Sequence, residues 1–348
     1  TGSTKASIKK DIYKSLESGE IDIIIGTHSL IQDKVKFKNL GLAIVDEQHK
    51  FGVAQRSKLW AKSVIPPHIL IMTATPIPRT LAMSAYGDLD ISLIDELPPG
   101  RREITTVHRY DKNRLSVFRF IKDQINEGRQ VYVVYPLIEE SKNMDFKDLM
   151  DGYESLSREF EQPKYQISIV HGKMKAQDKE FEMKRFENKE TQILIATTVI
   201  EVGVNIPNAS VMVIESSERF GLSQLHQLRG RVGRGMHKSY CILMSGNKLS
   251  NESRLRIKTM TETNNGFIIA EKDLEIRGPG DIMGTQQSGV ITLKIADLMS
   301  DQEILTYARK CAKKILEEDK DLLDNKNKTL LNTYNHIAQN NDLWSYIG

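Results

Sequence analysis

The segment Leu42-Ala-Ile-Val-Asp-Glu-Gln-His49 decides the fold. It opens with four apolar residues, as in a short strand buried on both faces of a parallel sheet, and two adjacent acids follow at once. Parallel α/β sheets bind ligands at the carboxyl ends of their strands, so we expect Asp46 and Glu47 at such an edge. Taken alone, the pair fits a nucleotide site and an ordinary solvated strand end equally well.

Similar short apolar runs recur along the chain and alternate with helical patterns. The residues Leu115, Phe118, Ile121 and Ile125 step by three and four, and Gly128 is expected to end that helix. A second stripe runs through Phe146, Leu149, Tyr153, Leu156 and Phe160. This alternation predicts a doubly wound α/β architecture. Strands are predicted over Asp22–Gly26, Leu42–Asp46, Ile69–Thr73, Ile104–His108, Gln130–Tyr135, Gln166–His171, Gln192–Thr197, Ser210–Glu215 and Ser239–Met244.

Length and composition indicate a globular protein of two or more units. The 348 residues are 39% hydrophobic and 27% charged, with a net charge of +3 and no basic block. Turn residues near 98–100 and a loss of strand signals near 246 predict units over 1–100, 101–245 and 246–348. The last unit is expected to be mostly helical, with an amphipathic helix marked by Ile304, Ala308, Cys311 and Ile315. Two cysteines and no apolar run long enough for a membrane span favour the cytoplasm.

For several residues we expect a structural role rather than a functional one. Met174, Phe181 and Met183 are expected in the core, and Cys241 is expected to be a buried apolar residue. Neither cysteine has the neighbours of a zinc site, so we expect no zinc.

Three further motifs follow predicted strands or helices. Thr73-Ala-Thr75 and Thr197-Thr198 place hydroxyl groups at strand ends, where they can contact phosphates. Gln227-Leu-Arg-Gly-Arg-Val-Gly-Arg234 packs three arginines and two glycines together, and guanidinium groups match phosphate oxygens. A solvated basic turn is the simpler alternative for this last motif.

In this order and spacing, the motifs resemble those of superfamily-two helicases over essentially the whole chain. Asp46–His49 resembles the Walker B motif, and Gly26-Thr-His-Ser-Leu30 resembles a nucleic-acid-contacting motif of the first lobe. Asp46–Arg56 and Asp273–Gly280, followed by Gly284–Gly289, are similar to the RecG branch-migration family. Gln48 and Pro279 separate the chain from the related transcription-repair coupling motors, which remain the alternative enzyme.

The resemblance implies two RecA-like lobes with parallel sheets flanked by helices, the first lobe incomplete, and a helical translocation segment. It implies ATP with Mg²⁺, Asp46 as the water-mediated metal ligand, Glu47 as the catalytic base, and Arg231 and Arg234 as γ-phosphate contacts. Nucleotide coupling falls to Gln48, His49, Thr73, Thr75, Gly203, Asn205 and Gln227. DNA contacts fall to Gly26, Thr27, His28, Thr197 and Thr198, and translocation to Arg256, Arg277 and Gln287.

The implied function is that of an ATP-dependent translocase on duplex DNA, which remodels stalled replication forks and branch-migrates Holliday junctions in recombination and repair. The implied partners are branched DNA and single-strand-binding protein. The implied state is a monomer at the bacterial nucleoid, without a membrane.

The phosphate-binding loop Gly-x₄-Gly-Lys-Ser/Thr of such motors is absent from the sequence. We therefore expect a fragment that begins within the first lobe and that does not hydrolyse ATP by itself. A non-catalytic nucleic-acid-binding module of the same fold is the alternative, although such a module would not need Glu47, Arg231 or Arg234.

Overall fold

The computed structural model describes residues 1–2, 4–47, 59, 62–63, 65–73, 92–94, 96, 98, 101–136, 142–197, 206–277 and 301–340. Side chains of 142–148, 277, 302 and 337–340 are not described. Backbone contacts divide the chain into two compact units. Unit 1 contains the described residues of 1–73 together with 301–340, and unit 2 contains those of 92–277. Each unit is described by itself.

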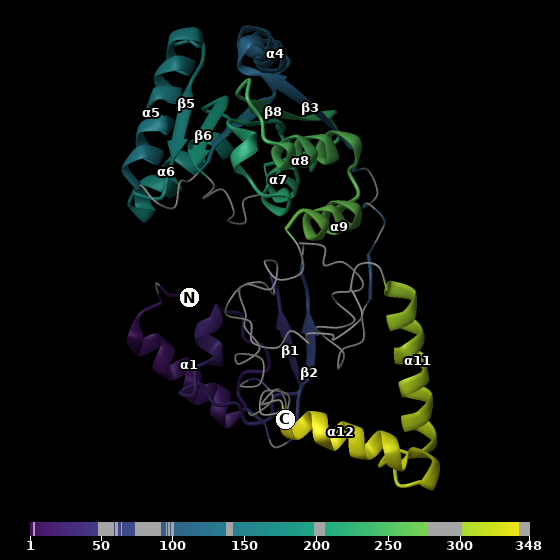
Figure 1. Ribbon diagram of the computed structural model, residues 1–348. Helices are drawn as coiled ribbons and strands as arrows, with labels where there is room; N and C mark the ends of the chain where they lie inside the picture. Colours follow the sequence, from purple (N-terminus) through teal and green to yellow (C-terminus); the bar gives the residue numbers. More distant parts are fainter. Residues whose placement is uncertain are drawn as a thin grey trace. The chain divides into compact units, whose positions relative to one another are not determined.

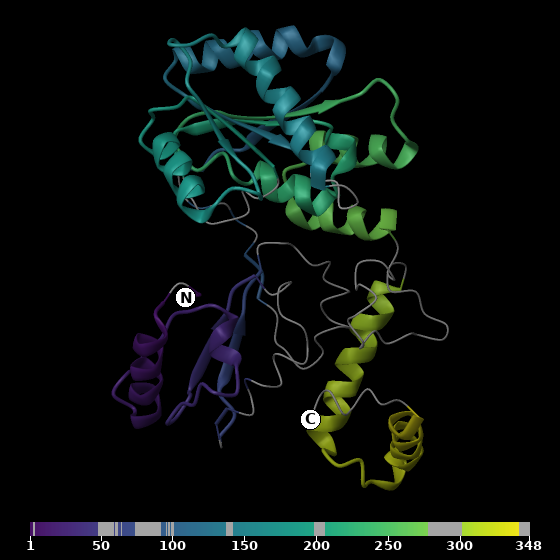
Figure 2. The ribbon, with the colours of Figure 1, turned by 90° about the vertical axis from the view of Figure 1, so that its left-hand side faces the viewer.

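Unit 2 is a six-stranded, fully parallel sheet with the strand order β3-β8-β7-β4-β6-β5 (Figures 1 and 2). Its strands are β3 (Ile104–Tyr110), β4 (Gln130–Tyr135), β5 (Ile167–Val170), β6 (Ile193–Thr197), β7 (Ala209–Ile214) and β8 (Ser239–Ser245). The parallel sheet expected from the apolar runs is confirmed, because β4, β6 and β7 are buried at every residue.

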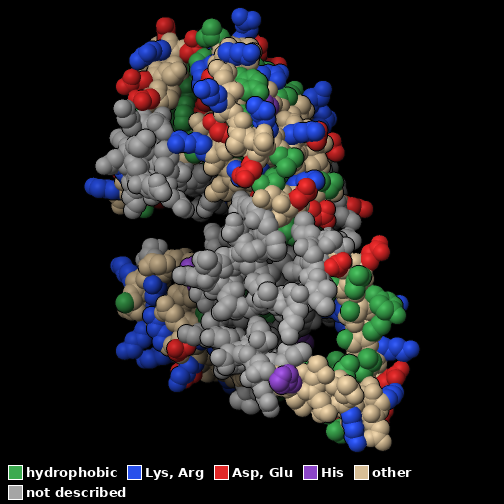
Figure 3. Space-filling model, in the orientation of Figure 1, with side chains coloured by type: hydrophobic (Ala, Val, Ile, Leu, Met, Phe, Trp, Pro, Cys, Tyr) green, Lys and Arg blue, Asp and Glu red, His purple; other side chains and the backbone are tan. Residues whose placement is uncertain are grey.

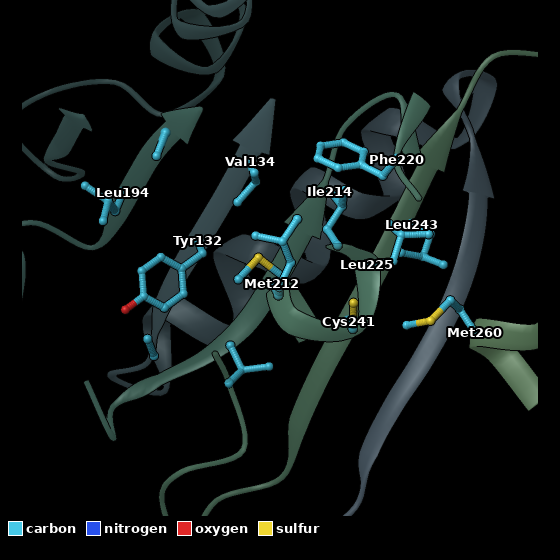
Figure 4. Close-up of a cluster of buried hydrophobic side chains, with 14 of the residues drawn as sticks. Tyr132, Val134, Leu194, Met212, Ile214, Phe220, Leu225, Cys241, Leu243 and Met260 are labelled. Atoms are coloured by element: carbon cyan, nitrogen blue, oxygen red, sulfur yellow. The ribbon is translucent and has the colours of Figure 1, made fainter. Parts of the chain in front are cut away.

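The two faces of this sheet are covered by different helices, because successive side chains of a strand point to opposite faces. Val131, Val133 and Ile195 pack with α4 (Arg114–Asn126) and α5 (Lys142–Glu159). Tyr132, Val134 and Leu194 pack on the other face, in the cluster drawn in Figure 4. That second face is covered by α6 (Ala176–Glu187), α7 (Leu222–Arg229), α8 (Asn251–Glu262) and α9 (Gly266–Arg277).

Local residues explain where these helices begin and end. Gly128 adopts φ 79° just after α4, as a left-handed position that favours glycine, which confirms its predicted role as a stop. Ser250 caps α8 by accepting a hydrogen bond from the Ser253 amide at 3.1 Å. Short 3₁₀ turns, η3 (Asp111–Asn113) and η5 (Ser217–Arg219), lead from strand ends towards α4 and α7.

Unit 1 contains a two-stranded parallel sheet, β1 (Leu42–Val45) with β2 (His68–Ile71). Its small core joins Val45 and Leu59 to Ile31, the last residue of the 3₁₀ turn η1 (His28–Ile31). The other described elements are α1 (Ala6–Ser18), α11 (Gln302–Glu318), η6 (Asn325–Asn327) and α12 (Lys328–Asn340). The helix expected around Ile304–Ile315 is therefore present.

Three sequence predictions are wrong in this structure. Asp22–Gly26 forms no strand, because no strand pairs with it among the described residues, and Ile23 and Ile25 are 81% and 92% exposed. Leu115 lies at the first turn of α4 and is 73% exposed, so the buried stripe of that helix uses Val117 instead. Phe181 is 61% exposed rather than in the core.

The predicted division at residue 246 stays a prediction. In the structure, α8 packs on β3 and η5, and α9 packs on α7 and α8, so these helices belong to unit 2. Among the helices described, none is long and apolar enough to cross a membrane.

Candidate functional site

The carboxyl edge of the β1–β2 sheet gathers the acids and one hydroxyl predicted for nucleotide chemistry. Val45 is in register with Ile71, and the Met72 amide donates to the Val45 carbonyl at 2.8 Å. Asp46 and Glu47 therefore leave β1 beside the residues that lead from β2 to Thr73. Asp46 and Thr73 are exposed and Glu47 is half-buried, so this edge is open to a ligand.

Glu47 has an uncommon backbone conformation. Its φ is 57°, in the left-handed region that non-glycine residues rarely adopt. The Glu47 amide donates to Asp46 Oδ1 at 2.9 Å, which helps to hold this turn. Such local strain persists where the surrounding structure enforces a special side-chain direction, and it is concentrated at functional sites.

The predicted nucleic-acid contacts Gly26, Thr27 and His28 lie where the chain enters η1. Thr27 Oγ1 is 3.2 Å from Ser29 Oγ, and the Leu30 amide donates to the Thr27 carbonyl at 3.0 Å. All three residues are exposed. Since Ile31 packs against Val45, this turn is fixed close to the strand that carries the two acids.

In unit 2, Thr197 ends β6 beside the end of β4, opposite Tyr135. β4 lies between β6 and β7, and the chain changes direction across the sheet at this point, where doubly wound folds bind ligands. Thr197 is 2% exposed, and its hydroxyl has no hydrogen-bond partner within the described ranges. A buried hydroxyl without a partner is available to a group supplied from outside these ranges.

The arginine motif forms the end of α7 and the loop over 230–235. Val232 is fully buried, and Gly233 adopts φ 78° with its Cα packed so closely on Ile104 that a Cβ would lie 2.9 Å from Ile104 Cγ1. Around these anchors Arg231 is half-buried and Arg234 is exposed, its Nε donating to the Gly230 carbonyl at 3.2 Å. The loop therefore presents two arginines from a fixed backbone, and Gln227 lies half-buried on α7.

Arg229 has a different place from the other two arginines. It is 2% exposed and donates to the carbonyls of Met260 at 2.9 Å and Thr263 at 2.8 Å, at the end of α8. It also lies 3.1 Å from His226 Nδ1 and 3.4 Å from Thr106 Oγ1. A cation at these carbonyls complements the negative end of the α8 dipole. Sequence reasoning grouped Arg229 with the phosphate-binding arginines, but the structure uses it to tie α7 to α8 and β3.

A second polar contact joins α7 to α9. Ser223 Oγ donates to Asp273 Oδ2 at 2.8 Å, and Asp273 is 4% exposed. The helix that precedes the arginine loop is thus bonded near both of its ends to the α8–α9 pair. This link was missed at the sequence level because Ser223 belongs to no motif and Arg229 was considered only as part of the arginine motif.

Burial and neighbouring arginines shape the electrostatics of this region. Burial, together with the charges of Arg229 and Arg101, lowers the pKa of His226 to about 4, so its imidazole is neutral at pH 7. Burial and then the charge of Arg234 lower the pKa of Arg101. Burial raises the pKa of Tyr132 to about 12, against the opposing effect of Arg234 and Arg231.

The ends of two motifs meet at this loop. A Cβ on Gly235 would overlap the Pro207 carbonyl, at 2.5 Å, so the arginine loop runs against the end of the segment over 197–207. Only a residue without a side chain allows so close an approach. Unit 2 thereby brings Pro207, which precedes β7, against the loop that carries Arg231 and Arg234, whereas Thr197 lies at the other end of the strands and Asp46 and Glu47 lie in unit 1.

The predicted translocation residues are only partly described. Arg256 on α8 pairs with Glu252 on the same helix at 3.2 Å, and its side chain is 21% exposed. Arg277 is the last residue of α9. The predicted residues Gln48, His49, Thr75, Thr198, Gly203, Asn205 and Gln287 lie outside the described residues.

Profiles of three helicase families match the chain one after another. "DEAD/DEAH box helicase" matches residues 1–84, "Helicase conserved C-terminal domain" matches 115–236, and "ATP-dependent DNA helicase RecG, domain 3, C-terminal" matches 263–348. The ATP-dependent DNA helicase RecG of Synechocystis is 50% identical over 92% of this chain, and that of Bacillus subtilis is 49% identical over 92%. The chain belongs to the RecG helicase family.

A solved structure of RecG bound to a three-way DNA junction supports the same assignment. It is 43% identical, covers 87% of this chain and has a TM-score of 0.65. This chain spans 38% of the Synechocystis relative, 46% of the Bacillus relative and 38% of the chain in that solved structure, that is, less than half of each. The expected pair of RecA-like lobes with parallel sheets and a helical C-terminal segment is confirmed.

The described residues fit one side of an ATP–Mg²⁺ site. Protein sites hold Mg²⁺ through one or two carboxylates together with substrate phosphates, and Asp46 and Glu47 supply carboxylates at an open strand edge. No group of three or more acidic, histidine or cysteine side chains gathers within the described ranges, so this chain offers no all-protein metal cage there. The phosphate-binding loop is absent from the sequence printed here.

Proposed function

We propose that this chain is the motor part of a RecG-type, ATP-dependent translocase on duplex DNA. The observation that supports this most directly is the 43% identity, over 87% of the chain, to a RecG that was solved on a three-way DNA junction. The position of Asp46 and Glu47 at a strand edge, and of the half-buried Arg231 and the exposed Arg234 on a fixed loop, agrees with nucleotide hydrolysis.

The roles that we propose for individual residues are those that the helicase motifs imply. Asp46 would hold Mg²⁺ through water and Glu47 would accept the proton of the attacking water, while Thr73 and Thr75 would sense the phosphates. Arg231 and Arg234 would neutralise charge on the transferred phosphoryl group, with Arg234 the better finger because it is exposed. The metal would supply charge neutralisation and orientation.

Nucleotide state would be passed on by Gln48, His49, Gly203, Asn205 and Gln227, and the DNA backbone would be held by Gly26, Thr27, His28, Thr197 and Thr198. The translocation residues Arg256, Arg277 and Gln287 would act through the α8–α9 pair. That pair is bonded to the arginine helix through Arg229 and Asp273. Movement of the arginine loop would therefore be passed on to α8 and α9.

We further propose that the whole protein remodels stalled replication forks and branch-migrates Holliday junctions as a cytoplasmic, nucleoid-associated monomer. Branched DNA and single-strand-binding protein are its proposed partners. The 348 residues alone should hydrolyse no ATP, since the phosphate-binding loop is absent from them.

A chimera tests this proposal. The corresponding part of Bacillus subtilis RecG is replaced by this chain, and ATP turnover is measured with and without a three-way DNA junction. We expect junction-stimulated turnover of about 1–100 per second in the chimera, none for the 348 residues alone, and a fall to background in the Glu47→Gln chimera. A well-folded chimera without turnover would favour the non-catalytic module instead.

A further inference from the structure

A groove lies at the edge of the unit 2 sheet that is opposite to Thr197. Arg102, Arg129 and Lys238 stand two, one and one residues before β3, β4 and β8, and all these strands are parallel, so the three residues reach the same amino-terminal edge. They line one cavity of about 410 Å³, together with the last turn of α4 and the loop over 236–238.

The lining of this groove has an excess of positive charge. Within the described ranges, the side chains of Arg102, Arg129 and Lys238 make no ion pair or hydrogen bond. The single acid of the lining is Glu127, which accepts a hydrogen bond from Gln124 Nε2 at 3.4 Å. On the face of the molecule shown in Figure 3, by contrast, Lys and Arg are mixed with Asp and Glu. A concave surface lined by one sign of charge concentrates the field and attracts a ligand of the other sign.

The lining also offers flat and apolar surface. Tyr240 lines the groove, and its ring is held edge-on by Phe120 with centroids 5.1 Å apart. Met236 is 81% exposed at the same place. Two of the three cations are arginines, whose planar fork matches phosphate oxygens in pairs. Nucleic acids combine phosphates with flat bases, whereas an acidic peptide supplies carboxylates alone.

We propose that this groove is a second nucleic-acid site, which binds the phosphodiester backbone of a DNA strand through Arg102, Arg129 and Lys238. The groove lies at the other end of the sheet from Thr197, and its lining residues 236–238 directly follow the arginine loop in sequence. The identity of the ligand rests on the proposed function, because that function brings DNA to this chain. The inference that an anion binds in the groove rests only on the cavity and the charges that line it.

Binding of a fluorescently labelled oligonucleotide, single-stranded and duplex, to the 348-residue chain tests the site as salt is varied. The Arg129→Gln/Lys238→Gln variant is compared with Arg119→Gln/Lys248→Gln. The control pair removes the same charges from an exposed arginine of α4 and from an exposed lysine just after β8. The groove variant should bind about three- to tenfold more weakly, and its plot of log K against log salt should be shallower by ~2, or ~1 per cation.

The control variant should change that slope by less than ~0.5. Equal losses of affinity in both variants would contradict binding at the groove. Competition by poly-glutamate as effective as that by an oligonucleotide of equal charge would contradict a nucleic-acid ligand. Circular dichroism checks folding, and if the double variant does not fold, Arg102→Gln against Arg119→Gln decides by the same slope. A wild-type chain that binds no DNA contradicts the proposed function. Binding that the groove variants leave unchanged contradicts this site alone.

Discussion

The strands β4 and β1 are alike in sequence and unlike in structure. Both are short, apolar and paired in parallel, yet every residue of β4 is buried while β1 has one buried residue of four. The difference comes from their neighbours: β4 lies inside six strands with helices on both faces, whereas β1 pairs with β2 alone in the described part of unit 1. An apolar run predicts a strand that is stable when buried, and the number of neighbouring strands and helices determines how far it is buried.

The largest expected effect on stability comes from a substitution in the core of unit 2. Phe186 is fully buried beside Tyr132, with ring centroids 5.1 Å apart, so Phe186→Ala should lower the free energy of unfolding of unit 2 by about 3–5 kcal/mol. Ile44→Ala on β1 should cost less than about 1 kcal/mol, because Ile44 is 57% exposed. Native-state hydrogen exchange of the β4, β6 and β1 amides measures both. Similar losses would mean that the two sheets are equally packed.

A second test sharpens the contrast inside the arginine motif. Arg229→Met leaves the buried carbonyls of Met260 and Thr263 without their donor, so unit 2 should lose about 2–4 kcal/mol in urea unfolding. Arg234→Met should leave stability nearly unchanged because Arg234 is exposed, and in the chimera it should lower ATP turnover about 10³-fold or more. The interpretation of the motif fails if the two variants exchange these effects.

The pH dependence of stability tests the same buried contact. His226 has a pKa of about 4 when folded, below the ordinary value of 6.5, so the unfolded chain takes up a proton first as the pH falls. The contribution of neutral His226 to the free energy of unfolding is therefore fully present above pH 6.5 and is lost as the pH falls towards 4. The loss is about 2 kcal/mol between pH 7.5 and pH 5. In the His226→Gln variant, the urea midpoint should depend less on pH between pH 7.5 and pH 5. If the midpoint of the variant changes with pH as much as that of the wild type, other groups cause the pH dependence.

The smallest effect is expected in the loop that carries Arg231 and Arg234. Gly233→Ala should cost about 1–2 kcal/mol, since φ is 78° and the new Cβ would press on Ile104. Gly230→Ala is the matched control: Gly230 has φ −65°, and a Cβ there would meet only ordinary contacts. Thermal unfolding of the two variants separates a backbone requirement at Gly233 from a general loss of glycine. Equal melting temperatures would remove the special role of Gly233.

Much of unit 2 could be predicted from sequence, because its central strands are short, mostly apolar and rich in Ile and Val. The acids after β1 and the two glycines of the arginine loop could also be predicted, since motif spacing records them directly. The separate place of Arg229 could not, because three arginines within six residues look equivalent until the end of α8 is brought beside one of them. The absence of a strand over Asp22–Gly26 could not be predicted either. Its residues suit a strand, but a strand also needs a partner strand, and local sequence does not show whether one is present.

The position of β3 at the edge of its sheet has a consequence for synthesis on the ribosome. In the part of the chain that the structure describes, β3 pairs with β8 alone, and the partner of Ile104 is Ser239. At about 5–20 residues per second, the ribosome takes on the order of 7–27 s to make the chain between them. During that interval the hydrogen-bonding groups of β3 lack the partner strand that they have in the folded sheet. Unit 2 can thus close only after its last strand is made, and the nascent chain depends on β3 staying soluble until then.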